Sequence, residues 1–249
     1  MHPKTDKEIK AIRQSGRILN EVFAATRREL KSGMTTQELA AVVRREIAAR
    51  DAEPVLLGYH GFPDVVCISV NQQVVHGIPG AYQLQADDLV SLDLCVGYQG
   101  MITDSAFTTV VGGVDKASSR VRRGLRATEE ALFAGIEQVR PGVHIGDISQ
   151  AIQRRLLRDG LGVVEDLVGH GVGHAVHEDP EIPNYGRAGA GPTLKSGMTV
   201  AIEPMATLGG KEVQLESDGW TISTQDRSLS MHFEHTVLVT PTGYEVLTG

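Results

Sequence analysis

The sequence predicts an α/β protein made of two similar halves, and three patterns support this prediction. Apolar residues recur at helical spacing over residues 5–30, whereas later segments alternate apolar and polar residues as half-buried strands do. Residues 140–148 match residues 31–39 at an offset of 109, and the strand-like segment 199–203 matches 89–93 at an offset of 110. Two matches at nearly one offset indicate an internal duplication, which would relate the halves by a pseudo-two-fold axis.

Two helices are predicted at the start of the chain. Thr5 or Asp6 can cap the helix over residues 5–30, because short polar side chains accept the first free backbone N–H groups. Thr35 and Glu38 form a capping-box pattern, so a second helix is expected to begin there. Both helices carry an apolar stripe, which predicts that one face of each is buried.

Strands are predicted to follow these helices. Residues 65–70 form an apolar strand, residues 71–73 a turn, and residues 74–79 a returning segment. In the second half a long helix is expected over residues 115–139. The order of helices followed by strands therefore repeats along the chain, which is typical of an α/β duplication.

A hairpin over residues 91–104 carries two acidic side chains in an apolar setting. Gly97 and Gly100 bracket two residues that could form a tight loop. With that loop, Asp93 would lie directly opposite Asp104 on the neighbouring strand. Buried carboxylates that face each other require a metal ion or a shared proton. The hairpin therefore predicts one side of a metal site.

Three further segments supply ligand types that complete such a site. Residues 169–178 contain three histidines flanked by glycines, residues 201–204 end a predicted strand at Glu203, and residues 231–236 place Glu234 before another apolar strand. Carboxylates with one histidine and no thiolate form a hard ligand set. Such a set suits Mn, Fe, Co or Zn in a two-metal site better than a structural zinc.

Composition restricts the class of protein further. The 249 residues carry a net charge of −7, with 41% hydrophobic and 22% charged residues, which is typical of a globular protein and argues against nucleic-acid or anionic-membrane partners. The sequence shows no apolar run long enough for a membrane span and no signal-peptide pattern. Cys67 and Cys95 lack a CxxC spacing and are expected to be reduced thiols in a cytoplasmic protein. We expect one catalytic domain over residues 1–249, with halves of 1–113 and 114–249.

Several motifs together resemble the type I methionine aminopeptidases of the pita-bread metallopeptidase family. They lie at residues 58–63, 67–71, 76–79, 169–173, 177–178, 202–205, 218–221 and 234–236. The resemblance implies a pita-bread fold, with a central antiparallel sheet and helices outside it. It also implies hydrolytic removal of the initiator methionine from nascent chains and peptides whose second residue is small.

The resemblance also implies roles for individual residues, each at a position that matches a family motif. The implied ligands of two divalent metal ions (Co, Mn, Fe or Zn) are Asp93, Asp104, His170, Glu203 and Glu234. The implied catalytic residues are His76, His177 and Glu203, with Glu203 moving the proton of the attacking water. The implied substrate-binding residues are Tyr59, His60, Phe62, Cys67, His76, Val176, His177 and Trp220.

Several positions depart from the pattern of the family, Thr103 among them, where glycine is frequent. Phe62 stands where tyrosine is common and Val176 where a larger aromatic residue can stand, so the pocket for the methionine side chain is expected to be roomier. Cys95 lies on the same strand face as Asp93 and is expected to be a small buried residue rather than a redox group.

Alternatives remain open at this stage. The nearest is an X-Pro peptidase or prolidase of the same fold, although such proteins usually carry an additional N-terminal domain. A second is a relative that binds partners without catalysis, although such proteins typically lose metal ligands. A third is an α/β domain whose acidic residues are simply solvated. The resemblance suggests a monomer that could associate with the ribosome.

Overall fold

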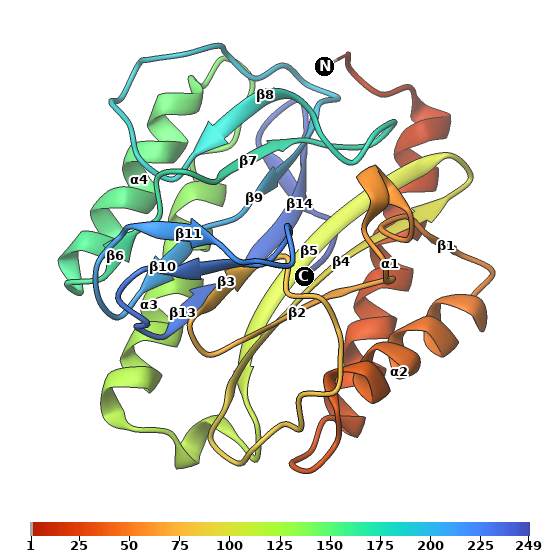
Figure 1. The fold of residues 1–249 in the computed structure, drawn as a ribbon. Coiled ribbons are helices and arrows are strands. Elements are labelled where there is room, and N and C mark those ends of the chain that lie inside the picture. Colours follow the sequence, from red (N-terminus) through yellow and green to blue (C-terminus); the bar gives the residue numbers. More distant parts are fainter. Residues whose placement is uncertain (1) are drawn as a thin grey trace.

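The computed structural model describes residues 2–249, which form four α-helices, two 3-10 helices and fifteen strands (Figure 1). The helices are α1 (Asp6–Glu29), α2 (Thr36–Ala48), α3 (Ser119–Ile136), α4 (Ile145–Arg158), η1 (Tyr59–Gly61) and η2 (Val114–Lys116). The strands of the first half are β1 (Glu53–Pro54), β2 (Cys67–Val70), β3 (Gln73–Val75), β4 (Leu89–Tyr98) and β5 (Met101–Val110). Those of the second half are β6 (Gly162–Val163), β7 (Val168–Gly171), β8 (Glu178–Pro183), β9 (Thr199–Ile202), β10 (Met205–Thr207), β11 (Val213–Leu215), β12 (Ile222–Thr224), β13 (Ser230–His232), β14 (Glu234–Val239) and β15 (Tyr244–Val246).

The main sheet is antiparallel and its order is β1-β4-β5-β14-β9-β7-β8, with β2 on β4 and β15 on β14. The order is symmetrical about the β5–β14 pair, since the hairpin β4–β5 of the first half meets β14 and β9 of the second. Figure 1 shows α1 and α2 beside one half and α3 and α4 beside the other. Two three-stranded sheets, β13-β10-β6 and β11-β12-β3, complete the arrangement. The predicted α/β class, with its central antiparallel sheet and outer helices, is confirmed.

The two halves contain equivalent backbone hydrogen bonds as well as equivalent strands. N–H groups near the start of the second helix of each half donate to carbonyl groups of the segment before the next long strand. The bonds join Gly33 to Leu84, Thr36 to Tyr82 and Gln37 to Gly80 in the first half, and Gly142 to Leu194, Ile145 to Pro192 and Gly146 to Ala190 in the second. The donors differ by 109 residues and the acceptors by 110. The offset found in the sequence therefore has a counterpart in the backbone.

Helix starts follow the predicted capping patterns. Thr5 caps α1 through a reciprocal pair of hydrogen bonds with Glu8, and Thr35 caps α2 in the same way with Glu38. The predicted helix over 115–139 begins later than expected. The 3-10 helix η2 precedes it, and α3 starts only at Ser119, where Ser118 supplies the cap.

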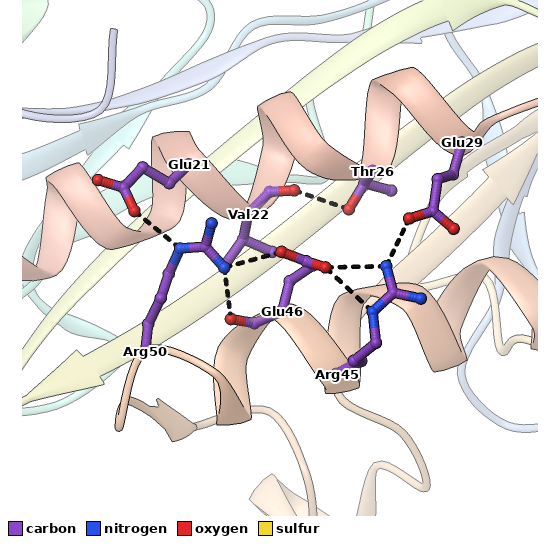
Figure 2. Close-up of polar contacts among 7 residues, drawn as sticks. All are labelled: Glu21, Val22, Thr26, Glu29, Arg45, Glu46 and Arg50. Atoms are coloured by element: carbon purple, nitrogen blue, oxygen red, sulfur yellow. Dashed lines mark hydrogen bonds and ion pairs between the residues drawn. The ribbon is translucent and has the colours of Figure 1, made fainter.

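Ion pairs join α1 to α2 on their exposed sides (Figure 2). Arg50 donates to Glu21 of α1 at 2.8 Å, and Arg45 donates to Glu29 at 2.5 Å. Glu46 lies between the two arginines and accepts from both. Because these groups are largely exposed to water, which screens their charges, the pairs add little to stability. The buried stripes of both helices, which include the fully buried Leu19 and Leu39, contribute more to holding the helices on the sheet.

The turn of the β4–β5 hairpin differs from the prediction. Its central residues are Gln99 and Gly100, with φ angles of 50° and 76°, so that Tyr98 pairs with Met101. Two positive φ angles in succession are what a type I′ hairpin turn requires, and Gly100 at the second position meets this requirement at low cost. The predicted pairing of Asp93 with Asp104 is therefore wrong. Asp104 lies opposite Cys95, and Asp93 lies two positions further along the ladder.

The segment at 74–79 also differs from its prediction. Strand β3 ends at Val75 and pairs with β12 of the second half instead of returning along β2. Beyond it His76 has a positive φ of 58°, and Gly77 accepts a hydrogen bond from Ile68 at 2.8 Å. A Cβ atom on Gly77 would lie 2.3 Å from the Ile68 carbonyl oxygen, so only glycine permits this approach. This contact holds His76 next to the sheet.

No helix among residues 2–249 is long and apolar enough to cross a membrane.

Gly16 on α1 provides a test of how closely the helix packs on the C-terminal segment. A Cβ atom there would lie 2.2 Å from the Leu247 carbonyl oxygen. Alanine is favoured over glycine in a helix by up to about 1 kcal/mol. Overpacking costs about 1–3 kcal/mol, and a backbone contact has little room to relax. We expect Gly16→Ala to lower the free energy of unfolding measured by urea denaturation.

The neighbouring Arg17→Ala is the matched control, because Arg17 is exposed and makes no side-chain hydrogen bond or ion pair with residues 2–249. It should change stability by less than about 0.5 kcal/mol. Equal stability of Gly16→Ala and the wild type would show that this packing is loose.

Candidate metal centre

The hairpin and β14 present acidic residues on one face of the main sheet. Asp93 pairs with Ala106, and Ala106 pairs in turn with Glu234 of β14. Cys95 and Asp104 form the next pair of the hairpin on the same face, two residues further along each strand. Residues that face each other across strands, and residues two apart along a strand, share a face of the sheet. Both acids of the hairpin therefore project to the same side as Glu234.

The remaining two predicted ligands join this face from β9 and β7. His170 of β7 pairs with Ala201 of β9, and Ala201 pairs with Thr236 of β14. Thr236 bonds to the backbone N–H and C=O of Asp104, at 2.9 and 2.8 Å, which extends the row to the hairpin. Glu203 follows β9 two positions after Ala201, on the same face. The structure thus brings all five predicted ligand residues to one side of the sheet.

The ligand atoms lie at distances suited to a shared cation. One ligand atom from each of Asp104, His170 and Glu234 lies within 4.8 Å of the others, and all three residues are buried. His170 Nε2 lies 3.4 Å from Glu203 Oε1 and 3.9 Å from Asp104 Oδ2. Asp104 Oδ1 is buried without any hydrogen-bond partner among the described residues. A buried carboxylate oxygen without a partner is costly, and a bound divalent ion would satisfy it. The residues present therefore fit a metal.

Burial changes the protonation of the four acids in the metal-free protein. Burial raises the pKa of Asp104 to about 7 and that of Glu203 to about 8. Burial, together with the charge of Asp104, raises the pKa of Asp93 and Glu234 well above their ordinary values. Four carboxylates in one buried site cannot all ionise without a compensating positive charge. A divalent cation would provide that charge and favour their ionised forms.

His170 is held in the tautomer that a metal ligand needs. Its Nδ1 donates a hydrogen bond to the carbonyl oxygen of Gly171 at 3.0 Å. Nε2 is then unprotonated and faces the carboxylates. Burial lowers the pKa of His170 to about 4, so the ring is neutral near neutral pH. A backbone carbonyl that fixes the tautomer of a histidine is the usual partner of a metal-binding imidazole.

The two predicted catalytic histidines lie at the edge of this site. His177 contacts the His170 ring, with centroids 4.4 Å apart, and its Nδ1 lies 2.9 Å from the Tyr59 hydroxyl. Burial lowers the pKa of His177, and burial together with His232 and His177 lowers that of His76 to about 4. Burial also raises the pKa of Tyr59, so its hydroxyl stays protonated and available as a donor. Both histidines are neutral near pH 7.

An apolar cluster lies beside the two predicted catalytic histidines, and it contains the other predicted substrate residues except His60. The cluster comprises Leu56, Phe62, Cys67, Cys95 and Val176, with Tyr59, Ile78, Ile102 and Trp220 packed against it. Phe62 and Trp220 meet edge to face, with centroids 5.2 Å apart. His60 is exposed and meets the Tyr59 ring edge to face. The structure therefore places an apolar cluster next to the candidate metal centre.

A cavity of about 590 Å³ opens onto the centre, and its lining includes His76, Asp93, His170, His177 and Glu203. A groove of about 610 Å³ lies near β8 and α4 and is mostly apolar. None of the predicted site residues lines that groove. The predicted catalytic histidines and several predicted ligands therefore line the cavity at the candidate metal centre and not the groove.

Sequence analysis assigned no role to His232, which the structure places inside the site. The side chain is buried, and neither ring nitrogen has a hydrogen-bond partner within residues 2–249. Its Nε2 lies 3.6 Å from Glu203 Oε2. The residue precedes Glu234 by two positions, which is the strand period, and this spacing was the available signal. Cys95 is buried as expected. Burial raises the pKa of its thiol, so the neutral thiol stands beside Asp104.

Comparisons with known proteins agree with this site. The model of metallopeptidase family M24 matches residues 10–241. The chain is 43% identical over 245 residues to the methionine aminopeptidase of Clostridium perfringens, covering 98% of this chain and 97% of that protein. The crystal structure of methionine aminopeptidase from Thermotoga maritima superposes with a TM-score of 0.96 at 38% identity, covering 100% of this chain and 99% of that one.

The prolidase of Pyrococcus furiosus has the same fold but a different extent. It superposes with a TM-score of 0.78 at 24% identity, and the match covers 99% of this chain but 65% of the prolidase. At that identity the likeness shows the fold alone. The expected pita-bread fold is confirmed by both structural matches. From its site, its fold and a family match over nearly its whole length, the chain belongs to metallopeptidase family M24.

Proposed function

We propose that this protein is a methionine aminopeptidase that hydrolyses the first peptide bond of chains beginning with methionine followed by a small residue. One observation carries the proposal most directly. Four carboxylates, two of them buried and two partly buried, and a neutral histidine converge on one sheet face beside an apolar cluster. Metal-dependent hydrolysis needs the first of these features, and recognition of a methionine side chain needs the second. The near-complete match to the Clostridium perfringens enzyme supports this combination.

The ligands of two divalent ions would be the four acids and the one histidine of the site. Asp104 and Glu234 would be shared, Asp93 would belong to one position, and His170 with Glu203 to the other. When bound, the ions would supply Lewis acidity and lower the pKa of a coordinated water. Cobalt, manganese, iron and zinc all suit these oxygen and nitrogen ligands.

The remaining roles belong to side chains around the ligands. Glu203 Oε1 faces His170, so Oε2 is available to take up the proton of the attacking water. The Tyr59 hydroxyl lies 2.9 Å from His177 Nδ1. With Tyr59 as the donor, the proton of His177 would be on Nε2, where it would bind the developing oxyanion of the scissile carbonyl. His76, neutral at the other side of the cavity, would bind the peptide nitrogen and assist departure of the amine.

The apolar cluster would hold the methionine side chain, with Phe62, Cys67, Val176 and Trp220 as its walls. His60, exposed at the rim, would contact the substrate main chain. Nascent chains are the expected natural substrates. This assignment also leads us to propose a cytoplasmic location, a monomeric state and association with the ribosome. An X-Pro peptidase is the second candidate, because the prolidase shares the fold.

Release of free methionine from Met-Ala-Ser distinguishes the two candidates. We expect chelated protein to be inactive and to become active on addition of Co²⁺ or Mn²⁺, with an X-Pro dipeptide left intact. Met-Trp-Ser, which has a bulky second residue, is the matched control and should be cleaved poorly. Cleavage of the X-Pro dipeptide alone would assign the protein to the second candidate.

Asp104→Asn tests the shared ligand. The amide cannot supply the negative charge that two cations require. Changing even a residue that merely supports a metal ligand costs about 10–100-fold in activity or metal affinity, and a shared ligand should cost at least that much. We expect loss of methionine release and of metal binding by calorimetry, with an unchanged circular dichroism spectrum. The control is Asp115→Asn, an exposed position outside the site. Full activity of Asp104→Asn would refute the assignment.

The raised pKa values predict an unusual pH dependence for metal-free protein. An acid whose pKa is raised on folding binds more protons in the folded state than in the unfolded state. Stability therefore falls as pH rises from the unfolded pKa, about 4, towards the folded values of about 7 for Asp104 and about 8 for Glu203. We expect chelated protein to unfold at lower urea concentration at pH 8 than at pH 5.

Added Mn²⁺ should restore stability at pH 8, because it binds only the folded state. Asp104→Asn should show a smaller loss between pH 5 and pH 8, since one titrating group is missing. Chelated protein that is equally stable at both pH values would contradict the raised pKa values.

A further inference from the structure

The N-terminal segment is fastened beside the candidate active site. The backbone N–H of Lys4 donates to the Gly197 carbonyl at 2.7 Å, and Thr5 then caps α1. Figure 1 shows the chain before α1 passing near the turn between β7 and β8. We call residues 172–178 the histidine loop, because they include His174 and His177. They comprise this turn and the first residue of β8. The segment and the loop are far apart in sequence but in direct contact.

Lys4 is a buried lysine that crosses this loop. Its side chain has no exposed surface, and Nζ lies 3.0 Å from Glu178 Oε2. The stem passes Gly173, where a Cβ atom would lie 2.4 Å from Lys4 Cε. Gly173 also has a φ of 143°, so both its conformation and its lack of a side chain are needed at this point. The loop is therefore shaped around the lysine.

Glu178 connects the lysine to the backbone of the loop. Its Oε1 accepts the N–H groups of His174 at 2.6 Å and Ala175 at 3.2 Å, while Oε2 faces Lys4. Burial alone would raise the pKa of Glu178, but Lys4 and these two N–H groups hold it below its ordinary value. One ionised carboxylate thus ties the N-terminal segment to two successive N–H groups of the loop just before His177.

Two further contacts fix the same loop. The Gly173 carbonyl accepts a hydrogen bond from Ile102 of β5 at 2.7 Å, and His174 Nε2 lies 2.7 Å from Glu8 Oε1 in the first turn of α1. The His174–Glu8 contact is exposed, whereas the Lys4–Glu178 pair is not. A buried ion pair rarely adds net stability, but removal of one partner is strongly destabilising to its surroundings. We therefore consider how the Lys4–Glu178 pair positions the histidine loop rather than how much it adds to stability.

We propose that Lys4 is a positioning residue that, through Glu178, holds the histidine loop so that His177 meets Tyr59 and the substrate carbonyl. Its importance for turnover rests on the proposed function, in which His177 binds the oxyanion. The loop also carries Val176, a wall of the apolar pocket. Loosening the loop would displace His177 most, because its ring must lie within hydrogen-bond distance of the reacting atoms.

The test combines Lys4→Met with His177→Ala. A small misplacement of a catalytic group costs on the order of tenfold or more, so Lys4→Met should lower kcat on Met-Ala-Ser about tenfold. On the His177→Ala background the same substitution should lower kcat less than about twofold, because the group that Lys4 positions is absent. An equal loss of kcat on both backgrounds would overturn the proposal.

Two variants serve as controls. Lys4→Arg retains the charge and should recover most of kcat. Lys7→Met removes an exposed lysine in the first turn of α1. This lysine has no ion pair among residues 2–249, so the substitution should leave kcat unchanged. Should Lys4→Met fail to fold, Lys4→Gln, which keeps a hydrogen-bond donor, takes its place with the same expected outcome.

Hydrogen exchange supplies a measurement that does not depend on activity. The amides of His174 and Ala175 should exchange at least about tenfold faster in Lys4→Met than in the wild type, while those of β9 and β14 stay unchanged. Unchanged loop exchange would overturn the positioning role even if the protein releases methionine. Faster loop exchange in a protein that does not release methionine would refute the proposed function alone.

Discussion

The burial of four carboxylates on one face of the central sheet is the constraint on which this structure depends. Asp93, Asp104, Glu203 and Glu234 come from both halves of the chain, and their mutual repulsion would oppose folding if all were ionised. The metal-free protein can lessen this repulsion only by keeping protons that these acids normally lose. A divalent cation removes the need for those protons. Folding, protonation and metal binding are therefore linked at a single place.

The opposite face of the sheet makes this arrangement possible. Leu92 and Leu94 flank Asp93 along β4 and are fully buried in the main core, as is Val237 of β14. A slip of one residue in the pairing of these strands would turn the acids into the apolar core and the leucines into the cavity. The apolar core thus enforces the register on which the metal centre depends.

The protein compensates buried negative charge in two ways. At the metal centre the positive charge would come from outside the chain, whereas at Glu178 it comes from Lys4. The two places are adjacent, because His177 immediately precedes Glu178 and its ring packs on that of His170. Lys4, near the N-terminus, is thereby connected to His170, a predicted ligand, through one ion pair and His177.

Local patterns and tertiary contacts determined different parts of this result. Helix starts at Thr5 and Thr35 were predictable, because capping depends on neighbours in sequence. The motifs also indicated which acidic and histidine residues gather on one face of the sheet, whereas their assignment as metal ligands stays a prediction. The register of the hairpin was not, since two glycines suited the turn and only the backbone angles at Gln99 and Gly100 decided between them. The partner of Lys4 lies 174 residues away. Such contacts form only when the sheet brings distant segments together. Local sequence patterns do not indicate which distant groups will be buried against each other.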